Sequence, residues 1–241
     1  MNAFIYYEFI DARHFSLPVI RPLKEVFHMR ILIINPNSDQ NTEVLLQRTA
    51  EHFLQERTAV ETISITSAPR LIVTYADQAA SVPELIKLFR QRGDQYDAFV
   101  LACHGDPNLE LVQELAGGKP VYGIAQASMR MAAMRGGFAV LTPSAKIIPK
   151  KFALARKYHC EDQMKTVQVS RSDRREDLLE AAQAALQVPG VESIVLGCAN
   201  YSGLSGWLEQ QLGVPVFDGL LWALVLAEGD VAIRQSQNLE A

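Results

Sequence analysis

An internal repeat, offset by 95 residues, constrains the fold of this chain more than any other feature of the sequence. Residues 97–103 (DAFVLAC) align with residues 192–198 (ESIVLGC), and the match continues from 118–122 (GKPVY) to 213–217 (GVPVF). Each copy reads as an apolar strand, a cysteine just past its end, a helix, and a Gly-x-Pro-Val entry into the next strand. The repeat therefore predicts two similar halves, each presenting one thiol at the end of a strand.

A second, shorter echo supports the same duplication. Residues 34–37 (INPN) and 141–144 (LTPS) each close the first strand of a half with a polar-Pro-polar turn. Strands that alternate with helices at this spacing predict an α/β fold of two pseudosymmetric lobes, each a mainly parallel sheet flanked by helices. Because ligands bind at the carboxyl ends of parallel strands, we expect the active site in the cleft between the lobes. Four turns should meet there: 35–38, 103–107, 142–144 and 198–202.

The composition narrows the class of protein and its surroundings. The chain has 241 residues, of which 49% are hydrophobic and 21% charged, so a real core is expected. A net charge of −4 with no basic stripe argues against a nucleic-acid partner, and the adjacent Lys150 and Lys151 are interpreted as solvated surface. Three cysteines form no disulfide framework, which favours a reducing, cytoplasmic location. No apolar run is long enough to span a membrane.

Cap signals predict where two of the helices begin. One helix is expected over residues 81–92, with Pro83 in its first turn, where the missing N–H costs little. Another is expected to run to Leu186 from a capping box formed by Asp173 and Glu176.

The equivalent cysteines, Cys103 and Cys198, are the candidate catalytic residues. A free cysteine usually packs as a small hydrophobe, and Cys160, which has no partner in the repeat, is interpreted in that way. Packing alone gives no reason for two cysteines at equivalent strand ends. Two alternatives fit less well: zinc would need closely spaced ligands, and nucleophilic hydrolysis would need a histidine base held by a third residue.

Two thiols facing one carbon can move a proton from one side of it to the other. One thiolate removes the proton next to a carbonyl group, and the opposite thiol returns one. Each cysteine precedes a predicted helix, whose N-terminal N–H groups favour the thiolate and can hold the developing enolate oxygen. No nucleotide-binding fingerprint is present, and neither a metal nor another cofactor is expected.

Four motifs in order make the chain resemble the Asp/Glu/hydantoin racemase superfamily. They are residues 35–38 (NPNS), 102–107 (ACHGDP), 196–199 (LGCA) and 213–219 (GVPVFDG). The Gly-Asp-Pro that follows the first cysteine is most similar to the hydantoin and allantoin racemase branch. The resemblance covers roughly residues 29–230. It implies a cofactor-independent enzyme, often a homo-oligomer, in which Cys103 and Cys198 are the two acid/base residues and the substrate lies between the lobes.

The resemblance also implies how the chain is divided. Residues 29–125 together with 218–241 would form the first lobe, because the last helix returns to it, and residues 126–217 would form the second. Residues 1–28 precede the first strong strand and are expected to be an N-terminal extension of uncertain role. The alternative is a segment that packs on a partner subunit.

Residues of the four turns are the candidates for binding the substrate. They are Asn37, Ser38, His104, Gly105, Thr142, Ala199 and Asn200. Helix capping explains several of these polar residues equally well, and Asp106 most simply caps the helix that follows it.

The chain also departs from the pattern of hydantoin racemases near the expected pocket. His104 replaces a bulky apolar residue, and Ala199-Asn200-Tyr201 replaces Ala-Gly-Met. We therefore interpret the chain as a racemase of a hydantoin-like substrate, either a 5-substituted hydantoin or allantoin, and leave the natural substrate open. The alternatives are an aspartate- or glutamate-type racemase, a decarboxylase or cis-trans isomerase on the same scaffold, and a non-catalytic two-lobed binding protein.

Overall fold

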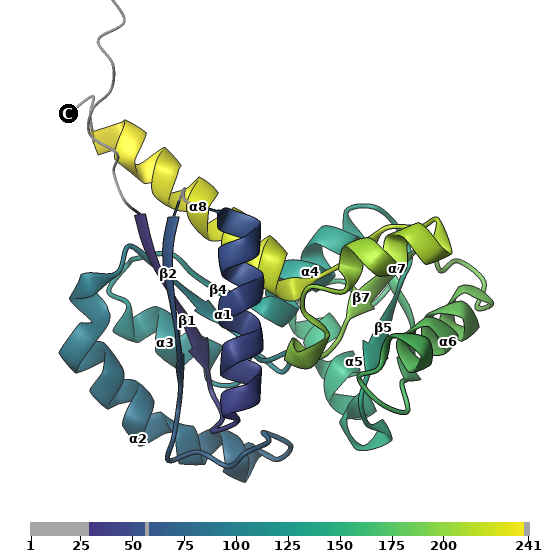
Figure 1. Ribbon diagram of the computed structural model, residues 1–241, viewed down its shortest axis with the longest axis horizontal. Coiled ribbons are helices and arrows are strands. Elements are labelled where there is room, and N and C mark those ends of the chain that lie inside the picture. Colours follow the sequence, from purple (N-terminus) through teal and green to yellow (C-terminus); the bar gives the residue numbers. More distant parts are fainter. Residues whose placement is uncertain (1–28, 56–57, 239–241) are drawn as a thin grey trace, which may run out of the picture.

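Two four-stranded parallel sheets form the centres of two lobes (Figure 1). The computed structural model describes residues 29–55 and 58–238, so the expected extension at residues 1–28 lies outside the described residues. The strand order is β2-β1-β3-β4 in the first sheet and β6-β5-β7-β8 in the second, and every pairing is parallel. The two sheets thus have the same topology, and the predicted α/β class with two similar halves is confirmed.

The strands and helices alternate along the described chain. The strands are β1 (Met29–Asn35), β2 (Thr58–Ser64), β3 (Ala98–Leu101), β4 (Val121–Gly123), β5 (Phe138–Thr142), β6 (Met164–Val169), β7 (Ser193–Leu196) and β8 (Val216–Phe217). The α-helices are α1 (Gln40–Leu54), α2 (Tyr75–Arg92), α3 (Leu109–Leu115), α4 (Ile124–Ala133), α5 (Ile148–Lys157), α6 (Arg175–Leu186), α7 (Ser205–Leu212) and α8 (Gly219–Asn238). Three short 3₁₀ turns accompany them: η2 (Gly93–Gln95), η3 (Ala145–Ile147) and η4 (Ala199–Tyr201).

Strand β1 is apolar on both faces because helices cover both sides of its sheet. Ile31 and Ile33 pack into one core cluster with α1 and α8. Leu32 and Ile34 point the opposite way and pack into a second cluster with α2 and α3. A strand buried on both faces reads as a continuous apolar run, which explains why its sequence showed no alternation.

Helices α4 and α8 join the lobes, and Figure 1 shows α4 and the start of α8 between the two sheets. Ile124 and Ala127 of α4 belong to the core of the first lobe, whereas Met129 and Ala132 belong to that of the second. The apolar residues of α8 pack on the first sheet, and the partly buried Trp222 contacts the cores of both lobes. Helices α4 and α8 thus each contact the cores of both lobes, which holds the strand ends of both sheets close together.

Helix α2 begins earlier than its cap signals suggested. Its N-cap is Thr74, whose hydroxyl accepts from Asp77 N (3.0 Å) while the Asp77 carboxylate accepts from Thr74 N (2.6 Å). Pro83 therefore lies inside the helix, and the predicted start at residue 81 was wrong. The reciprocal capping box outweighed the preference of proline for a first turn.

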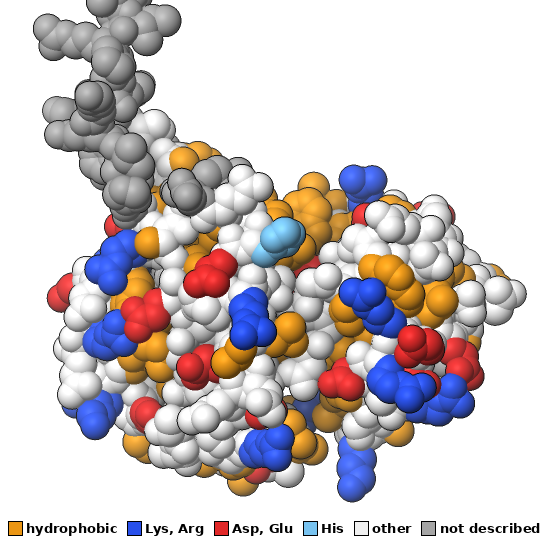
Figure 2. All heavy atoms as spheres, in the orientation of Figure 1, with side chains coloured by type: hydrophobic (Ala, Val, Ile, Leu, Met, Phe, Trp, Pro, Cys, Tyr) orange, Lys and Arg blue, Asp and Glu red, His pale blue; other side chains and the backbone are white. Residues whose placement is uncertain are grey.

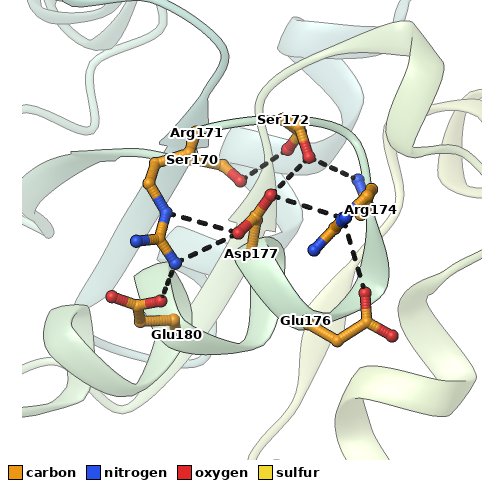
Figure 3. A network of polar contacts seen from close by, with 7 residues as sticks. All are labelled: Ser170, Arg171, Ser172, Arg174, Glu176, Asp177 and Glu180. Atoms are coloured by element: carbon orange, nitrogen blue, oxygen red, sulfur yellow. Dashed lines mark hydrogen bonds and ion pairs between the residues drawn. The ribbon is translucent and has the colours of Figure 1, made fainter.

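The predicted capping box of Asp173 and Glu176 was also wrong. Helix α6 has Arg174 as its N-cap, with no side-chain cap. Two residues before this N-cap, the Ser172 hydroxyl accepts from Arg174 N (3.1 Å) and donates to Asp177 in the first turn of the helix (2.5 Å). Figure 3 shows Arg171 and Arg174 on either side of the Asp177 carboxylate, and Arg171 lies 3.1 Å from it.

On the face of the molecule that Figure 2 presents, neither sign of charge dominates. Figure 2 shows acidic and basic side chains interspersed over both lobes on the face it presents. Within residues 29–55 and 58–238, every helix is too short or too polar to cross a membrane.

Candidate active site

A cavity of about 410 Å³ opens where the carboxyl ends of strands from both sheets meet. Its lining includes both repeated cysteines, each followed by two residues of its own turn. These six residues are Cys103, His104, Gly105, Cys198, Ala199 and Asn200. The topology accounts for this meeting, because β3 and β7 occupy the same place in their sheets and both end at the cleft.

The turn after β3 holds Cys103 by two backbone contacts. The amide of Gly105 hydrogen-bonds to the sulfur of Cys103, and Asp106 N donates to Cys103 O (2.9 Å). The chain turns sharply here, and Asp106 and Asn108 have positive φ angles of 41° and 60°. Both residues tolerate this left-handed conformation better than most, which is why a non-glycine turn can form.

The turn after β7 repeats these contacts at the same spacing. The amide of Asn200 hydrogen-bonds to the sulfur of Cys198, and Tyr201 N donates to Cys198 O (3.0 Å). Each cysteine precedes an α-helix, as predicted, but α3 begins only at Leu109 and α7 at Ser205, so neither cysteine lies at a helix N-terminus. A single amide two residues downstream of each cysteine takes the place of the predicted helix N-terminus.

Burial disfavours the thiolate at both cysteines. Desolvation raises the pKa of Cys103 to about 11, and it also raises the pKa of Cys198. The Lys151 ammonium and the local amide bond lower the pKa at each sulfur, in part offsetting the burial. The site therefore contains one cation that acts on both cysteines.

Lys151 is buried, with 3% of its surface exposed, so its interpretation as solvated surface was wrong. It reaches from α5 to the turns of both lobes and donates to His104 Nδ1 (2.9 Å), to His104 O and to Gly197 O (2.9 Å). The sequence held a signal for this burial, because Lys151 shares a helical face with the buried Leu154 and Ala155.

His104 is a structural link in this arrangement. Its Nε2 lies 3.2 Å from Ser128 Oγ, and the Ser128 hydroxyl donates to Ile124 O (2.7 Å). Burial and the Lys151 charge lower the pKa of His104 well below its usual range. The imidazole is therefore neutral, donates from Nε2 to Ser128 and accepts from Lys151 at Nδ1.

Asp106 caps a helix, but not the one that follows it in sequence. Its carboxylate accepts from Ala125 N (3.0 Å) and Gln126 N (2.7 Å) at the start of α4, and from the Tyr158 hydroxyl (2.5 Å). Burial raises the pKa of Asp106 to about 6. This contact ties the Cys103 turn to the helix shared by both lobes.

Two predicted substrate-binding asparagines line the cavity with their carbonyl oxygens already engaged. Asn37 Oδ1 accepts from Asn35 Nδ2 (3.0 Å) and from Asp39 N (2.8 Å). Asn200 Oδ1 accepts from Thr42 Oγ1 (2.7 Å). The Nδ2 groups of Asn37 and Asn200 form no hydrogen bond with any residue that the structure describes, which leaves two donors for a ligand.

The other predicted residues divide between cavity and core. Gly105 and Ala199 line the cavity. Ser38 belongs to neither: it is half-buried, lies outside the lining, and its amide donates to Pro69 O (3.3 Å). Thr142 is the last residue of β5, fully buried, and lies behind the lining.

Part of the cavity wall consists of residues outside the four turns predicted from the sequence. Residues 71–73 and Gln78 line it from the first lobe, and Lys146 and Lys150 line it from the second. No sequence motif distinguishes the 71–73 loop, so only the folded chain reveals it. Within residues 29–55 and 58–238, no three His, Cys, Asp or Glu side chains are grouped to hold a metal ion. Cys160 lies in the core of the second lobe, away from the cavity.

Known proteins resemble this chain in both sequence and fold. The family described as Asp/Glu/Hydantoin racemase matches residues 31–227. A hydantoin racemase of Paenarthrobacter aurescens is 32% identical over 85% of this chain and 92% of its own length. A hydantoin racemase of Rhizobium meliloti is 34% identical over 83% and 88%, respectively. The structure of an allantoin racemase from Klebsiella pneumoniae matches with a TM-score of 0.78 and 28% identity, covering 85% of this chain and 88% of that one.

With four strands in each of two like sheets and a shared cavity at their ends, the molecule has the two-lobed fold of these isomerases. The chain belongs to the Asp/Glu/hydantoin racemase family, and it is an isomerase.

Proposed function

We propose that this protein is a cofactor-independent racemase that inverts the carbon next to a carbonyl group in a hydantoin-like ring. One observation carries the proposal: Cys103 and Cys198 follow equivalent strands of the two sheets and line a single cavity. Relatives named as hydantoin racemases and a structural neighbour named as an allantoin racemase support the choice of ring. The first substrates to test are therefore 5-substituted hydantoins and allantoin.

The reaction transfers one proton to the enzyme and one back to the substrate. The thiolate of one cysteine takes the proton from the ring carbon, and the electron pair of the broken C–H bond moves into the adjacent carbonyl to give an enolate. The thiol of the other cysteine then donates its proton to the opposite face of that carbon. The first cysteine ends as a thiol and the second as a thiolate. This form can act on the opposite enantiomer, and proton exchange with solvent returns the enzyme to its starting form.

The enolate oxygen needs donors that are already in place. The free Nδ2 groups of Asn37 and Asn200 line the cavity from opposite lobes, and their oxygens are fixed by other contacts. Fixed amide donors cost no reorganisation when charge develops on the oxygen. We assign them the two carbonyl groups of the ring.

The test uses Cys103→Ser and Cys198→Ser, with Cys160→Ala as the matched control, because Cys160 is a free cysteine remote from the cavity. Single enantiomers of a 5-substituted hydantoin and of allantoin are incubated in D₂O. Optical rotation then reports inversion, and proton NMR reports exchange. We expect each serine variant to lose racemisation by at least about 10³-fold, since serine is a far weaker acid than cysteine, while Cys160→Ala retains it.

The pattern of exchange also assigns the roles. A serine variant that exchanges the proton of one enantiomer without inverting it identifies the remaining cysteine as the base for that enantiomer. Full racemisation by either serine variant would end the two-cysteine proposal. Activity on aspartate, glutamate, an arylmalonate or maleate, with none on the hydantoins and allantoin, would move the protein to another branch of its family.

A further inference from the structure

Lys151 has no role in the proton transfer just described, yet it is the only lysine in the cavity wall that is fully buried. Its ammonium donates to three acceptors: His104 Nδ1, His104 O and Gly197 O. Three acceptors require three N–H groups, and only the protonated form of lysine has them. The contacts therefore hold a positive charge inside the protein.

No carboxylate accepts a hydrogen bond from this charge among the described residues. His104 is neutral, and the other two acceptors are backbone carbonyl groups. The carboxylate that acts on Lys151, Asp106, already accepts from the start of α4 and from Tyr158. A buried charge without a partner is costly, so the site favours an anion beside Lys151.

The position of Lys151 indicates which anion that is. Its two backbone acceptors adjoin the two cysteines: His104 directly follows Cys103, and Gly197 directly precedes Cys198. We propose that Lys151 is a positioning residue whose ammonium group is the shared counter-charge for a thiolate at either Cys103 or Cys198. The role rests on the proposed function, because it explains how one buried site can use either thiol as the base.

The charges that face the pair are consistent with this role. Lys151 lowers the pKa of both cysteines. Burial lowers the pKa of Lys151 to about 8, although both cysteines act to raise it. The opposing charges are Asp106 on the side of Cys103 and Asp173, from the loop before α6, on the side of Cys198. Among the described residues, the Lys151 ammonium is the cation that lowers the pKa of both sulfurs.

A shared cation suits a reaction that moves the thiolate from one side to the other. In either direction the enzyme begins with one thiolate and one thiol and ends with their places exchanged. Because one ammonium acts on both sulfurs, it faces a thiolate before and after the transfer, and while both cysteines are thiols the negative charge is on the enolate. Lys151 therefore need neither move nor titrate.

The test is Lys151→Met together with the double variant Lys151→Met/His104→Leu. The double variant replaces both partners of the buried hydrogen bond by apolar groups, which keeps the site packed. Lys119→Met is the matched control, because Lys119 also donates to two backbone carbonyls, Gly93 O (3.0 Å) and Tyr96 O (2.8 Å), but lies outside the cavity lining. Alkylation by iodoacetamide is followed against pH, and peptide mass spectrometry reads Cys103 and Cys198 separately.

We expect both Lys151 variants to alkylate Cys103 and Cys198 at least about tenfold more slowly at pH 7.5, with the rate recovering at high pH. Lys119→Met should match the wild type. In the racemisation assay of Lys151→Met, kcat should fall by a similar factor while KM changes little, since the three N–H groups of Lys151 are engaged by the protein and not by the substrate. Unchanged alkylation profiles in a folded Lys151 variant would overturn the proposal.

A measurement that leaves Lys151 and His104 in place covers the case in which neither variant folds. One ammonium can balance only one thiolate, so thiolate absorbance in the Cys160→Ala background should rise in two separate steps with pH. A single step would overturn the proposal. Altered alkylation in a protein that racemises nothing would sink the proposed function alone, and cysteine-dependent racemisation with unaltered alkylation would sink the role of Lys151 alone.

Discussion

In each lobe a buried carboxylate links the cysteine turn to a helix N-terminus. The carboxylate belongs to the cysteine turn in the first lobe and to the start of the helix in the second. In the first lobe Asp106 lies in the cysteine turn and accepts from Ala125 N at the start of α4. In the second lobe Asp218 lies at the start of α8 and accepts from Leu220 N (2.9 Å) and from Gly203 N (2.6 Å) beyond the Cys198 turn.

The repeat shows that the carboxylate has changed its position in the sequence between the two lobes. An offset of 95 residues pairs Asp106 with Tyr201 and Gly123 with Asp218. The missing side chain at Gly123 makes room for the carboxylate, since a Cβ there would lie 2.4 Å from the carboxylate carbon of Asp106. The duplicated fold thus kept the location of the charge while the residue that carries it changed, and burial raises the pKa of both carboxyl groups to about 6.

The largest expected effect comes from a variant in which the first lobe carries both carboxylates, one at position 106 and one at position 123. Gly123→Asp would force a second carboxylate onto Asp106, with a steric clash and two like charges in one buried site. We expect a loss of about 5 kcal/mol in the free energy of unfolding, or no folded protein, as measured by urea denaturation.

The double variant Asp106→Gly/Gly123→Asp rebuilds the first lobe on the plan of the second. Glycine suits the positive φ of position 106, and an aspartate at position 123 can accept from Ala125 N as Asp218 accepts from Leu220 N. We expect the double variant to be at least about 2 kcal/mol more stable than Gly123→Asp. Equal stability would show that the two carboxylates do not occupy equivalent places.

Removing either carboxylate should cost somewhat less. Asp106→Ala leaves the amides of Ala125 and Gln126 and the Tyr158 hydroxyl without their acceptor, and Asp218→Ala does the same to Gly203 and Leu220. We expect each to lower the free energy of unfolding by about 3–4 kcal/mol, because each carboxylate accepts from backbone amides and from one hydroxyl, that of Tyr158 for Asp106 and that of Ser202 for Asp218. A loss below about 1 kcal/mol for either variant in urea denaturation would contradict this role of the carboxylate.

The fold was largely predictable from the sequence because its strongest signals are local and repeated. The continuous apolar runs at β1, β3, β5 and β7 indicate strands buried on both faces, and the repeated cysteines mark the carboxyl ends of β3 and β7. The errors lie at helix starts, as for α2 and α6, where competing polar residues offer alternative caps within a few positions.

The candidate site was predictable only in part. The repeat pointed to both cysteines, and helical spacing places Lys151 on the buried face of α5, but no local pattern encodes its hydrogen bonds to the turns of both lobes. The cap formed by Asp106 is similar: the sequence suggested the adjacent helix α3, whereas the carboxylate turns to α4, which is brought near by the pairing of β3 with β4. Contacts between segments distant in sequence decided both outcomes.

The next effect is a dependence of stability on pH, and it should be the same in both lobes. A carboxyl group whose pKa rises on folding, from its ordinary value of about 4 to about 6, holds its proton more tightly in the folded state. Between these pH values the folded protein binds more protons than the unfolded chain, so the free energy of unfolding falls as pH rises.

Asp106→Asn and Asp218→Asn remove the titration and serve as references. Relative to either variant, the wild type should lose about 3 kcal/mol between pH 4 and 6.5 and stay constant above that, because the full cost of burying the charge is then present. Urea denaturation at several pH values provides the measurement. A wild type that gains stability over the variants as pH rises would mean that the hydrogen bonds outweigh the burial.

The smallest effect separates the lobes again, through their cysteines. Asp106 raises the pKa of Cys103, whereas Asp218 is not among the charges that act on Cys198. Asp106→Asn should therefore speed the alkylation of Cys103 at pH 7.5 by about threefold, since one nearby negative charge disappears. Asp218→Asn should leave Cys198 at the rate of the wild type, read by the same peptide mass spectrometry. Equal acceleration of both cysteines would mean that the exchange of carboxylates between the lobes has no electrostatic consequence for the thiols, and that the asymmetry concerns packing alone.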